Sequence, residues 1–325
     1  MMRALPLLFL TLTCAWSQTD IDNFSTETND RFANDPSFVA AGFDFSGIGR
    51  TTQNDGRFAT LISDNVFLTA NHFRAAGEVT FFAGNDPTST PIVRTITGGQ
   101  QIGTSDFFIG VLDSAVPTTI TRYNFFTGGL DLVTNELGQA SVTSLAPGAD
   151  INDTPTTASI ARINGPTVFL GGISPTPGFS DVTNLTIGTN QVEFVQENSV
   201  IGMGSGAIEN SIALITIRNQ VGDVGFNTTL FEADLNGGDS GSPLFSVDDN
   251  GLTLLGLGSG SGEINLGTDT DPIDRDASIF SFTGNYSDEI QSFINANAIS
   301  SIPEPKTSLL LLLSIGFLRF RNRRT

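Results

Sequence analysis

The sequence of 325 residues has very few of the side chains that build metal centres and disulfides. It contains one cysteine (Cys14), one histidine (His72) and one tryptophan (Trp16). Zinc and iron–sulfur sites use three or four Cys and His ligands, so the composition excludes an ordinary site of either kind. Any reaction that needs an imidazole must use His72, because the chain has no other.

Positive charge is also scarce. The chain has 15 Lys and Arg against 34 Asp and Glu, which gives a formal net charge of −19 at pH 7. Binding to nucleic acid needs Lys and Arg against the phosphates, so this balance argues against a nucleic-acid partner. The length suffices for a well-buried core in one large domain or two small ones.

Residues 1–17 have the pattern of a secretory signal peptide. Arg3 precedes an apolar run from Ala4 to Ala15, and the small residues Ala15 and Ser17 fit a cleavage site after Ser17. The alternative is a buried N-terminal helix. Cleavage would remove both Cys14 and Trp16, so the exported protein would be stabilised without disulfides.

Residues 301–325 form a second distinctive segment. A Pro-Glu-Pro sequence at 303–305 is followed by an apolar run from Leu309 to Leu318 and then by four arginines. A helix over residues 307–318 would span about 18 Å at 1.5 Å per residue, short of a hydrocarbon core of roughly 30 Å. The arginines would stay on the cytoplasmic side. We therefore expect membrane contact only through this tail.

This tail resembles the PEP-CTERM sorting signal of Gram-negative-type bacteria. The resemblance implies that an exosortase-type enzyme is a partner and removes the tail. It also implies that the protein reaches the cell surface or the extracellular matrix. The alternative interpretation is a short permanent anchor.

The body of the chain between residues 40 and 300 is rich in short apolar runs separated by turn residues. These runs contain many Val, Ile, Thr and Phe residues and have the length of β-strands. Examples are Phe58–Ile62, Val66–Ala70, Glu78–Phe82, Phe107–Leu112, Ser211–Ile217 and Leu252–Leu257. No helical periodicity alternates with them, so an all-β antiparallel barrel or sandwich is expected.

Two other segments flank this β-rich body. Residues 286–297 predict one C-terminal helix, with Ser287 as its cap and with Ile290, Phe293 and Ile294 on one face. Residues 18–40 are polar and rich in acidic side chains. We expect them to form a loosely held lead-in to the domain.

The strongest chemical signal is the sequence Gly-Gly-Asp-Ser-Gly-Ser-Pro at residues 237–243. A serine between glycines suits a nucleophile, because glycine permits a tight turn and lets backbone N–H groups converge on one point. Serine is a weak nucleophile and needs a base oriented by a carboxylate. The base must be His72, which ends the sequence Thr-Leu-Ile-Ser-Asp-Asn-Val-Phe-Leu-Thr-Ala-Asn-His at residues 60–72.

Together these two segments resemble the corresponding motifs of trypsin/chymotrypsin-like serine proteases. The resemblance extends over about residues 43–298, and its motifs occur in the order of the family. It implies a protease domain at residues 41–300, built as two antiparallel β-barrels with a C-terminal α-helix. The boundary between the barrels is expected near residues 115–135.

The resemblance also implies residue roles. Ser240 would be the nucleophile and His72 the general base. Asp106, which opens the apolar strand at 107–112, would orient the imidazole. Asp113, which follows that strand, is the alternative carboxylate. The backbone N–H groups of Gly238 and Ser240 would form the oxyanion hole.

Substrate specificity and activation depend on residues near Ser240. Asp234 lies six residues before it, the position at which family members that cleave after Lys or Arg carry an acid. Ser259, Gly260 and Ser261 would line the same pocket. The alternative is that Asp234 is an exposed loop residue. In the family Asp239 pairs with a newly cut amino terminus, but no matching start occurs here, so its partner stays open.

The sequence thus predicts a secreted serine endopeptidase that acts on a protein or peptide substrate without a cofactor. Ca²⁺ could bind the acidic residues at 248–251 or 269–276, although the first reads equally as a hairpin turn and the second as a solvated loop. Two other functions stay open. One is a catalytically silent surface or matrix protein with the same fold, and the other is an ester hydrolase using the same triad.

Overall fold

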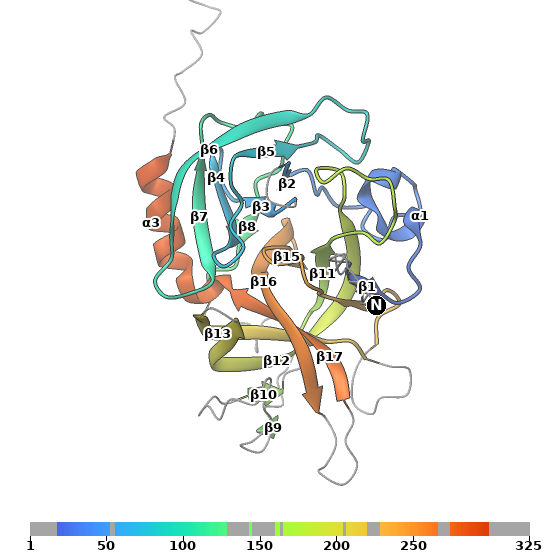
Figure 1. Ribbon diagram of the computed structural model, residues 1–325, viewed down its shortest axis with the longest axis vertical. Coiled ribbons are helices and arrows are strands. Elements are labelled where there is room, and N and C mark those ends of the chain that lie inside the picture. The colour runs from blue at the N-terminus through green and yellow to red at the C-terminus, as the bar shows by residue number, and fades with distance from the viewer. Residues whose placement is uncertain are drawn as a thin grey trace, which may run out of the picture.

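Six short antiparallel strands close into the first of two barrels in the computed structural model (Figure 1). Their order around the barrel is β2-β3-β4-β7-β6-β5, and pairing of β2 with β5 closes the ring. The strands are β2 (Ile48–Thr51), β3 (Phe58–Leu61), β4 (Val66–Ala70), β5 (Glu78–Phe81), β6 (Ile92–Gln101) and β7 (Phe107–Leu112). Every residue of β3 and β4 is buried, which explains their continuous apolar sequences.

The second barrel also has six antiparallel strands, ordered β11-β15-β16-β17-β13-β12, and the pairing of β11 with β12 closes it. These are β11 (Thr167–Gly172), β12 (Thr186–Met203), β13 (Gly206–Ile217), β15 (Pro243–Asp248), β16 (Gly251–Asn265) and β17 (Asp274–Phe282). Three short strands extend this sheet: β8 (Asn124–Phe125) on β16, and β10 (Ile160–Arg162) and β9 (Thr143–Ser144) beyond β12. The predicted all-β class with antiparallel barrels is confirmed.

A hydrophobic core joins the two barrels. Phe45 and Phe58 of the first barrel belong to the same buried cluster as Phe245 and Leu254 of the second. The ring of Tyr123, in the segment between the barrels, lies 4.6 Å from the ring of Phe245 between centroids. Aromatic packing therefore takes the place of disulfides at the junction.

One helix follows the last strand. α3 (Ser287–Asn297) lies against the outer side of the first barrel (Figure 1), with Ile290 completely buried, and its predicted extent is confirmed. The prediction that Ser287 caps it is wrong. A 3-10 turn, η2 (Thr283–Tyr286), runs directly into the helix, so Tyr286 occupies the cap position and no side chain caps the first turn.

The N-terminal stretch differs from the sequence-based expectation. Residues 18–40 are tied to the body rather than loosely held. They contain β1 (Asp20–Ile21), α1 (Thr26–Asn29) and the 3-10 turn η1 (Arg31–Ala33). β1 pairs with β14 (Ala233–Asp234). Arg31 is fully buried and donates hydrogen bonds to the Phe82 and Gly84 carbonyls at 2.9 and 2.6 Å. The segment is ordered by distant partners, which its own polar sequence does not reveal.

The structure describes eight stretches of the chain: residues 18–52, 56–128, 143–144, 160–162, 165–203, 206–219, 228–265 and 274–298. The predicted signal peptide at 1–17 and the sorting tail at 301–325 lie outside them. Within these stretches, no helix has the length and apolar character needed to cross a membrane.

Candidate active site

Strand pairing in the first barrel brings His72 and Asp106 together. β4 ends at Ala70, β7 begins at Phe107, and these two residues are antiparallel partners. The residues just beyond this pair, Asn71 after β4 and Asp106 before β7, must therefore lie side by side. The Asn71 N–H donates to the Asp106 carbonyl at 2.6 Å, which extends the ladder as far as the histidine.

The Asp106 carboxylate holds the His72 imidazole at two points. His72 Nδ1 lies 2.9 Å from Oδ1 and 2.8 Å from Oδ2 of Asp106, and Oδ1 also accepts the His72 backbone N–H at 2.9 Å. Asp106 is 2% exposed, so this contact is shielded from water. A carboxylate at Nδ1 places the proton there and leaves Nε2 as an acceptor.

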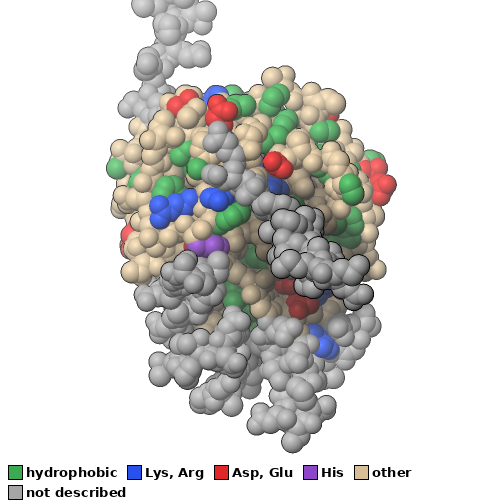
Figure 2. All heavy atoms as spheres, in the orientation of Figure 1, with side chains coloured by type: hydrophobic (Ala, Val, Ile, Leu, Met, Phe, Trp, Pro, Cys, Tyr) green, Lys and Arg blue, Asp and Glu red, His purple; other side chains and the backbone are tan. Residues whose placement is uncertain are grey.

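Ser240 reaches this pair from the second barrel. It lies in the turn between β14 and β15, and its Oγ is 2.8 Å from His72 Nε2 across 168 residues of sequence. The His72 side chain remains 13% exposed, and the purple histidine is visible at the surface in Figure 2. The structure thus brings all three predicted triad residues into one hydrogen-bonded chain that solvent can reach at its histidine.

The turn that carries Ser240 is fastened to β16. The Gly241 N–H donates to the Gly258 carbonyl, and the Gly258 N–H donates to the Ser242 carbonyl, both at 2.8 Å. Gly241 has a φ of +85°, and a Cβ there would lie 3.0 Å from the backbone nitrogen of Ala70 at the end of β4. Glycine is needed at this position because the serine turn approaches the histidine strand so closely.

Two backbone donors beside Ser240 are available for an anionic oxygen. Among the residues that the structure describes, none accepts a hydrogen bond from the N–H of Gly238 or of Ser240. Gly238 has a φ of +106°, a conformation that favours glycine. Donors without an internal acceptor, placed next to a nucleophilic oxygen, can stabilise the negative charge of a tetrahedral intermediate.

Asp113, the alternative carboxylate, lies elsewhere. It is exposed, and its Oδ1 accepts hydrogen bonds from the Thr95 N–H at 3.3 Å and the Ser114 hydroxyl at 3.2 Å. It follows the far end of β7, whereas Asp106 precedes the near end. Asp106 is therefore the carboxylate that contacts His72.

Asp239, the residue before Ser240, is completely buried, and its hydrogen bonds within the described residues involve none of the triad side chains. Burial raises its pKa from 3.8 to about 7, against the opposing effect of its hydrogen bonds and of Arg50. One of its hydrogen-bond donors is the hydroxyl of Thr19. No local pattern in the sequence marks Thr19 as part of this site.

Asp234 is also buried rather than an exposed loop residue, with 6% of its surface accessible. The Ser278 hydroxyl donates to its Oδ1, and no described residue donates to its Oδ2. Burial raises the pKa of Asp234 from 3.8 to about 6; Asp276 and Asp20 add to the rise, and Arg218 opposes it. A carboxylate buried in this way has a free oxygen for a cationic ligand.

The predicted pocket wall lies beside Asp234. In the pairing of β16 with β17, Ser261 is opposite Ser278, the residue that holds Asp234. Ser261 is exposed and Gly260 half-buried, so both are accessible. Ser259 is buried, and its hydroxyl is 2.6 Å from that of Ser281. Its side chain is thus occupied inside the barrel, which leaves only its backbone for substrate.

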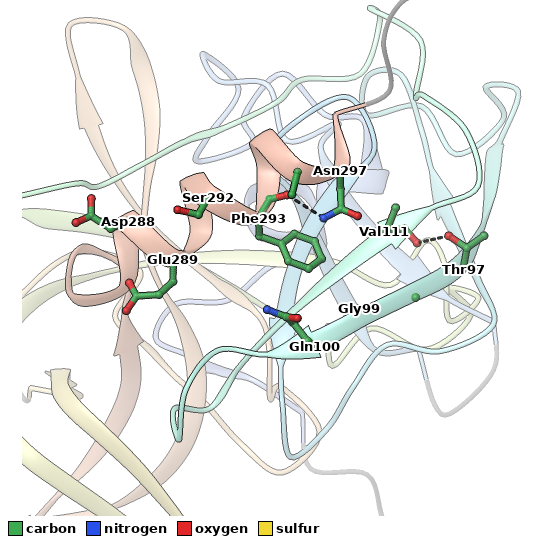
Figure 3. Close-up of a pocket in the computed structure, with 11 residues that line it drawn as sticks. Thr97, Gly99, Gln100, Val111, Asp288, Glu289, Ser292, Phe293 and Asn297 are labelled. Atoms are coloured by element: carbon green, nitrogen blue, oxygen red, sulfur yellow. Dashed lines mark hydrogen bonds between the residues drawn. The ribbon is translucent and has the colours of Figure 1, made fainter.

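A pocket of about 970 Å³ lies away from these residues, between α3 and strands β6 and β7 (Figure 3). Figure 3 shows Phe293 directed toward Gln100, with Asp288 and Glu289 at the start of the helix. The pocket includes no residue of the triad and no group with a reactive arrangement. The chemistry of the site therefore does not involve it.

The first predicted calcium segment is a hairpin turn. It joins β15 to β16, and Asp248 uses Oδ1 for the Asn250 N–H and Oδ2 for the Thr253 hydroxyl, both at 2.7 Å. Residues 269–273 of the second segment lie outside the described residues. Within the described ranges, no group of three or more His, Cys, Asp or Glu side chains is placed to hold a metal ion.

Comparison of the sequence with known protein families and curated proteins found no match at a significant level. The function of this chain is therefore inferred from the arrangement of its side chains.

Proposed function

We propose that this chain is a serine endopeptidase that hydrolyses peptide bonds through a His72–Asp106–Ser240 triad. The observation that carries the proposal is the hydrogen-bonded chain from Ser240 Oγ to His72 Nε2 at 2.8 Å and from His72 Nδ1 to the buried Asp106. Nucleophile, base and orienting carboxylate are all within hydrogen-bond distance, and each comes from a separate turn.

Acylation follows from these contacts. Ser240 Oγ attacks the scissile carbonyl carbon while its proton passes to His72 Nε2. The new imidazolium is stabilised by Asp106, and the carbonyl oxygen, now an anion, accepts hydrogen bonds from the N–H groups of Gly238 and Ser240. His72 then gives its proton to the leaving amine, and the C–N bond breaks to leave an acyl-enzyme.

Deacylation repeats these steps with water. A water molecule replaces the amine product and gives a proton to His72 Nε2 as its oxygen attacks the ester carbon. The second tetrahedral intermediate uses the same two N–H donors. Collapse returns the proton to Ser240 Oγ and releases the carboxylic acid product.

The substrate side chain before the scissile bond is proposed to be Lys or Arg. Asp234 supports this proposal because it is buried beside Ser261 and keeps one carboxylate oxygen without a described donor. A long cationic side chain that reached Asp234 would neutralise it and form a charge-assisted hydrogen bond.

Asp234→Asn is expected to lower kcat/KM for substrates with Lys or Arg before the scissile bond by about 10²-fold, equivalent to about 3 kcal/mol for a charge pair shielded from water. Hydrolysis of substrates with a neutral residue there should change little. Asp249→Asn, which removes the same charge from an exposed turn, is the matched control. Equal losses on both substrate classes would contradict the proposed specificity.

The same variant should also change the pH dependence of stability. The pKa of Asp234 is about 6 when folded and 3.8 ordinarily, so the folded state keeps this proton between those values while the unfolded state loses it. Its contribution to the free energy of unfolding therefore falls as pH rises through this window, by about 3 kcal/mol in all. Denaturant unfolding at pH 3.5 and pH 8 should show that Asp234→Asn gains stability relative to wild type at the higher pH.

We further propose that the protein is exported and sorted to the cell surface or extracellular matrix. The signal-like residues 1–17 and the PEP-CTERM-like tail at 301–325 support this route. Mass spectrometry of the protein from its natural host would show a chain that begins near Gln18 and lacks the tail. A full-length chain in the membrane fraction would instead indicate a permanent anchor.

The direct test of the enzyme is labelling with a fluorophosphonate, which reacts with activated serines. The mature chain, about residues 18–301, should carry one adduct at Ser240, located by mass spectrometry of its peptides. His72→Ala should abolish the label, because the serine then lacks its base. Absence of label in the wild-type chain would favour a catalytically silent binding protein.

A positive label leaves the substrate class to be assigned. Parallel assays with a peptide library and with short-chain esters distinguish the two hydrolases. Cleavage of peptides at a defined residue supports the endopeptidase, whereas ester hydrolysis without any peptide cleavage would replace it with an esterase using the same triad.

A further inference from the structure

The buried carboxylate of Asp239, next to Ser240, accepts three hydrogen bonds. Asp239 Oδ2 accepts hydrogen bonds from the Thr19 hydroxyl and from the Asn236 N–H, both at 2.9 Å. Its Oδ1 accepts one from the Ile173 N–H at 2.7 Å. The bonds from Thr19 and Ile173 connect the Ser240 turn to two distant parts of the chain, while the bond from Asn236 lies within the turn itself. The donor from Thr19 crosses 220 residues of sequence.

Thr19 is seated in a site that fits its side chain. Its own N–H donates to the Ile173 carbonyl at 3.0 Å, and the Asn236 side-chain amide donates to the Gln18 carbonyl at 2.8 Å. A Cβ at Gly172 would lie 1.8 Å from the Thr19 Oγ1, so the absence of a side chain there makes room for the hydroxyl. β1, which begins at the next residue, pairs with β14 just before the serine turn.

All three donors to Asp239 are neutral. No ion pair within the described residues involves Asp239. The buried cation that acts on it electrostatically, Arg50, donates its hydrogen bonds to the carbonyls of Gly56 and Asn184. A fully buried carboxylate depends on each of its donors, because a lost hydrogen bond cannot be replaced by water.

We propose that Thr19 is a positioning residue for the Ser240 turn, and that its hydroxyl, directly before the N-terminal strand β1, keeps the turn in a reactive conformation without a free amino terminus. This proposal rests on the proposed serine hydrolase function and adds its mode of activation. The enzyme is then active once β1 is seated on β14. No internal cleavage is needed to create a new, cationic amino terminus as a partner for Asp239.

The first test compares Thr19→Val with Thr19→Ser. Valine keeps the shape of threonine and removes the hydroxyl, whereas serine keeps the hydroxyl. We expect Thr19→Val to lower kcat by about 10- to 100-fold with KM within about 3-fold, because misplaced oxyanion donors weaken mainly the transition state. Thr19→Ser should stay within about 3-fold of wild type in both constants. Equal kcat for the two variants and wild type would overturn the proposal.

Hydrogen exchange gives a readout that does not require activity. Backbone amides in the peptide covering residues 236–242 should exchange at least about 10-fold faster in Thr19→Val than in wild type or Thr19→Ser. Peptides from β4 and β7 should not change. Unaltered exchange in the serine turn would overturn the proposal even if the wild-type chain proved inactive, so this result is separate from a failure of the enzyme assignment.

A third arm identifies the donor. A chain extended by a short Gly-Ser leader before Gln18 should match the mature chain in kcat and in exchange of residues 236–242. The proposal would be refuted if the extended chain lost activity and its residues 236–242 exchanged as fast as those of Thr19→Val. That result would show that a free amino terminus, and not the Thr19 hydroxyl, positions the Ser240 turn.

Discussion

Replacing Ser240 by alanine should lower kcat for a peptide substrate by about 10⁶-fold, the size of effect expected when a triad nucleophile is removed. The variant loses the oxygen proposed to form the acyl-enzyme but keeps the two backbone N–H donors at positions 238 and 240. A residual rate of about 10³ to 10⁴ over uncatalysed hydrolysis should therefore survive. Steady-state kinetics with a peptide cleaved by the wild-type chain measures the loss.

A double variant provides the control for this result. Ser240→Ala and His72→Ala act on one unit, so combining them should cost little more than either alone. Ser240 contributes a single hydrogen bond to His72, so thermal unfolding of Ser240→Ala should resemble that of wild type. A fall in kcat of less than about 10-fold would exclude Ser240 as the nucleophile.

Asp106→Asn should lower kcat by about 10⁴-fold at neutral pH. The carboxylate contacts His72 Nδ1 with both oxygens and is buried, so its loss removes the charge that stabilises the imidazolium. An asparagine amide can present N–H to Nδ1, which favours the tautomer with its proton on Nε2. That tautomer cannot accept the proton of Ser240.

Asp113→Asn is the matched control for this prediction. It removes the same charge from the other end of β7, at an exposed position whose carboxylate accepts hydrogen bonds from Thr95 and Ser114. Its kcat should stay within about 2-fold of wild type. The reverse outcome, with loss in Asp113→Asn and normal activity in Asp106→Asn, would require another carboxylate to orient His72.

Four strands of the first barrel, β3, β4, β5 and β7, were predicted from sequence to within a residue, whereas β2 and β6 matched none of the predicted runs. The runs at 66–70 and 107–112 match β4 and β7, since each is a continuous apolar segment bounded by polar turn residues. The strands of the second barrel were only partly predicted. β13 begins at Gly206 and β16 ends at Asn265, so both extend well beyond their apolar runs at 211–217 and 252–257. The parts of β13 and β16 outside these runs are held by backbone pairing with neighbouring strands. Such pairing leaves no hydrophobic pattern in the sequence.

Two features differ from the sequence-based expectation: the order of the N-terminal stretch and the start of the C-terminal helix. The polar stretch at 18–40 has weak local propensities, yet Arg31 and β1 are tied to β-strands and loops far along the chain. Ser287 looked like a helix cap, but the preceding 3-10 turn continues directly into α3 and leaves the serine in its first turn. For residues 18–40 tertiary packing overrides the local preference, whereas for Ser287 the preceding turn moves the start of the helix.

The chemistry and its assembly thus have different origins in this protein. Short motifs around His72 and Ser240 predict the nucleophile and the base, because the single histidine and the glycine-flanked serine can be recognised from composition and local spacing alone. Which carboxylates serve them is decided by folding. Asp106 reaches His72 through the pairing of β4 with β7, and Thr19 reaches Asp239 across 220 residues. Such contacts form only when the two barrels and the N-terminal strand pack together. Neither the hydrophobic periodicity nor the spacing of motifs in the sequence predicts that packing.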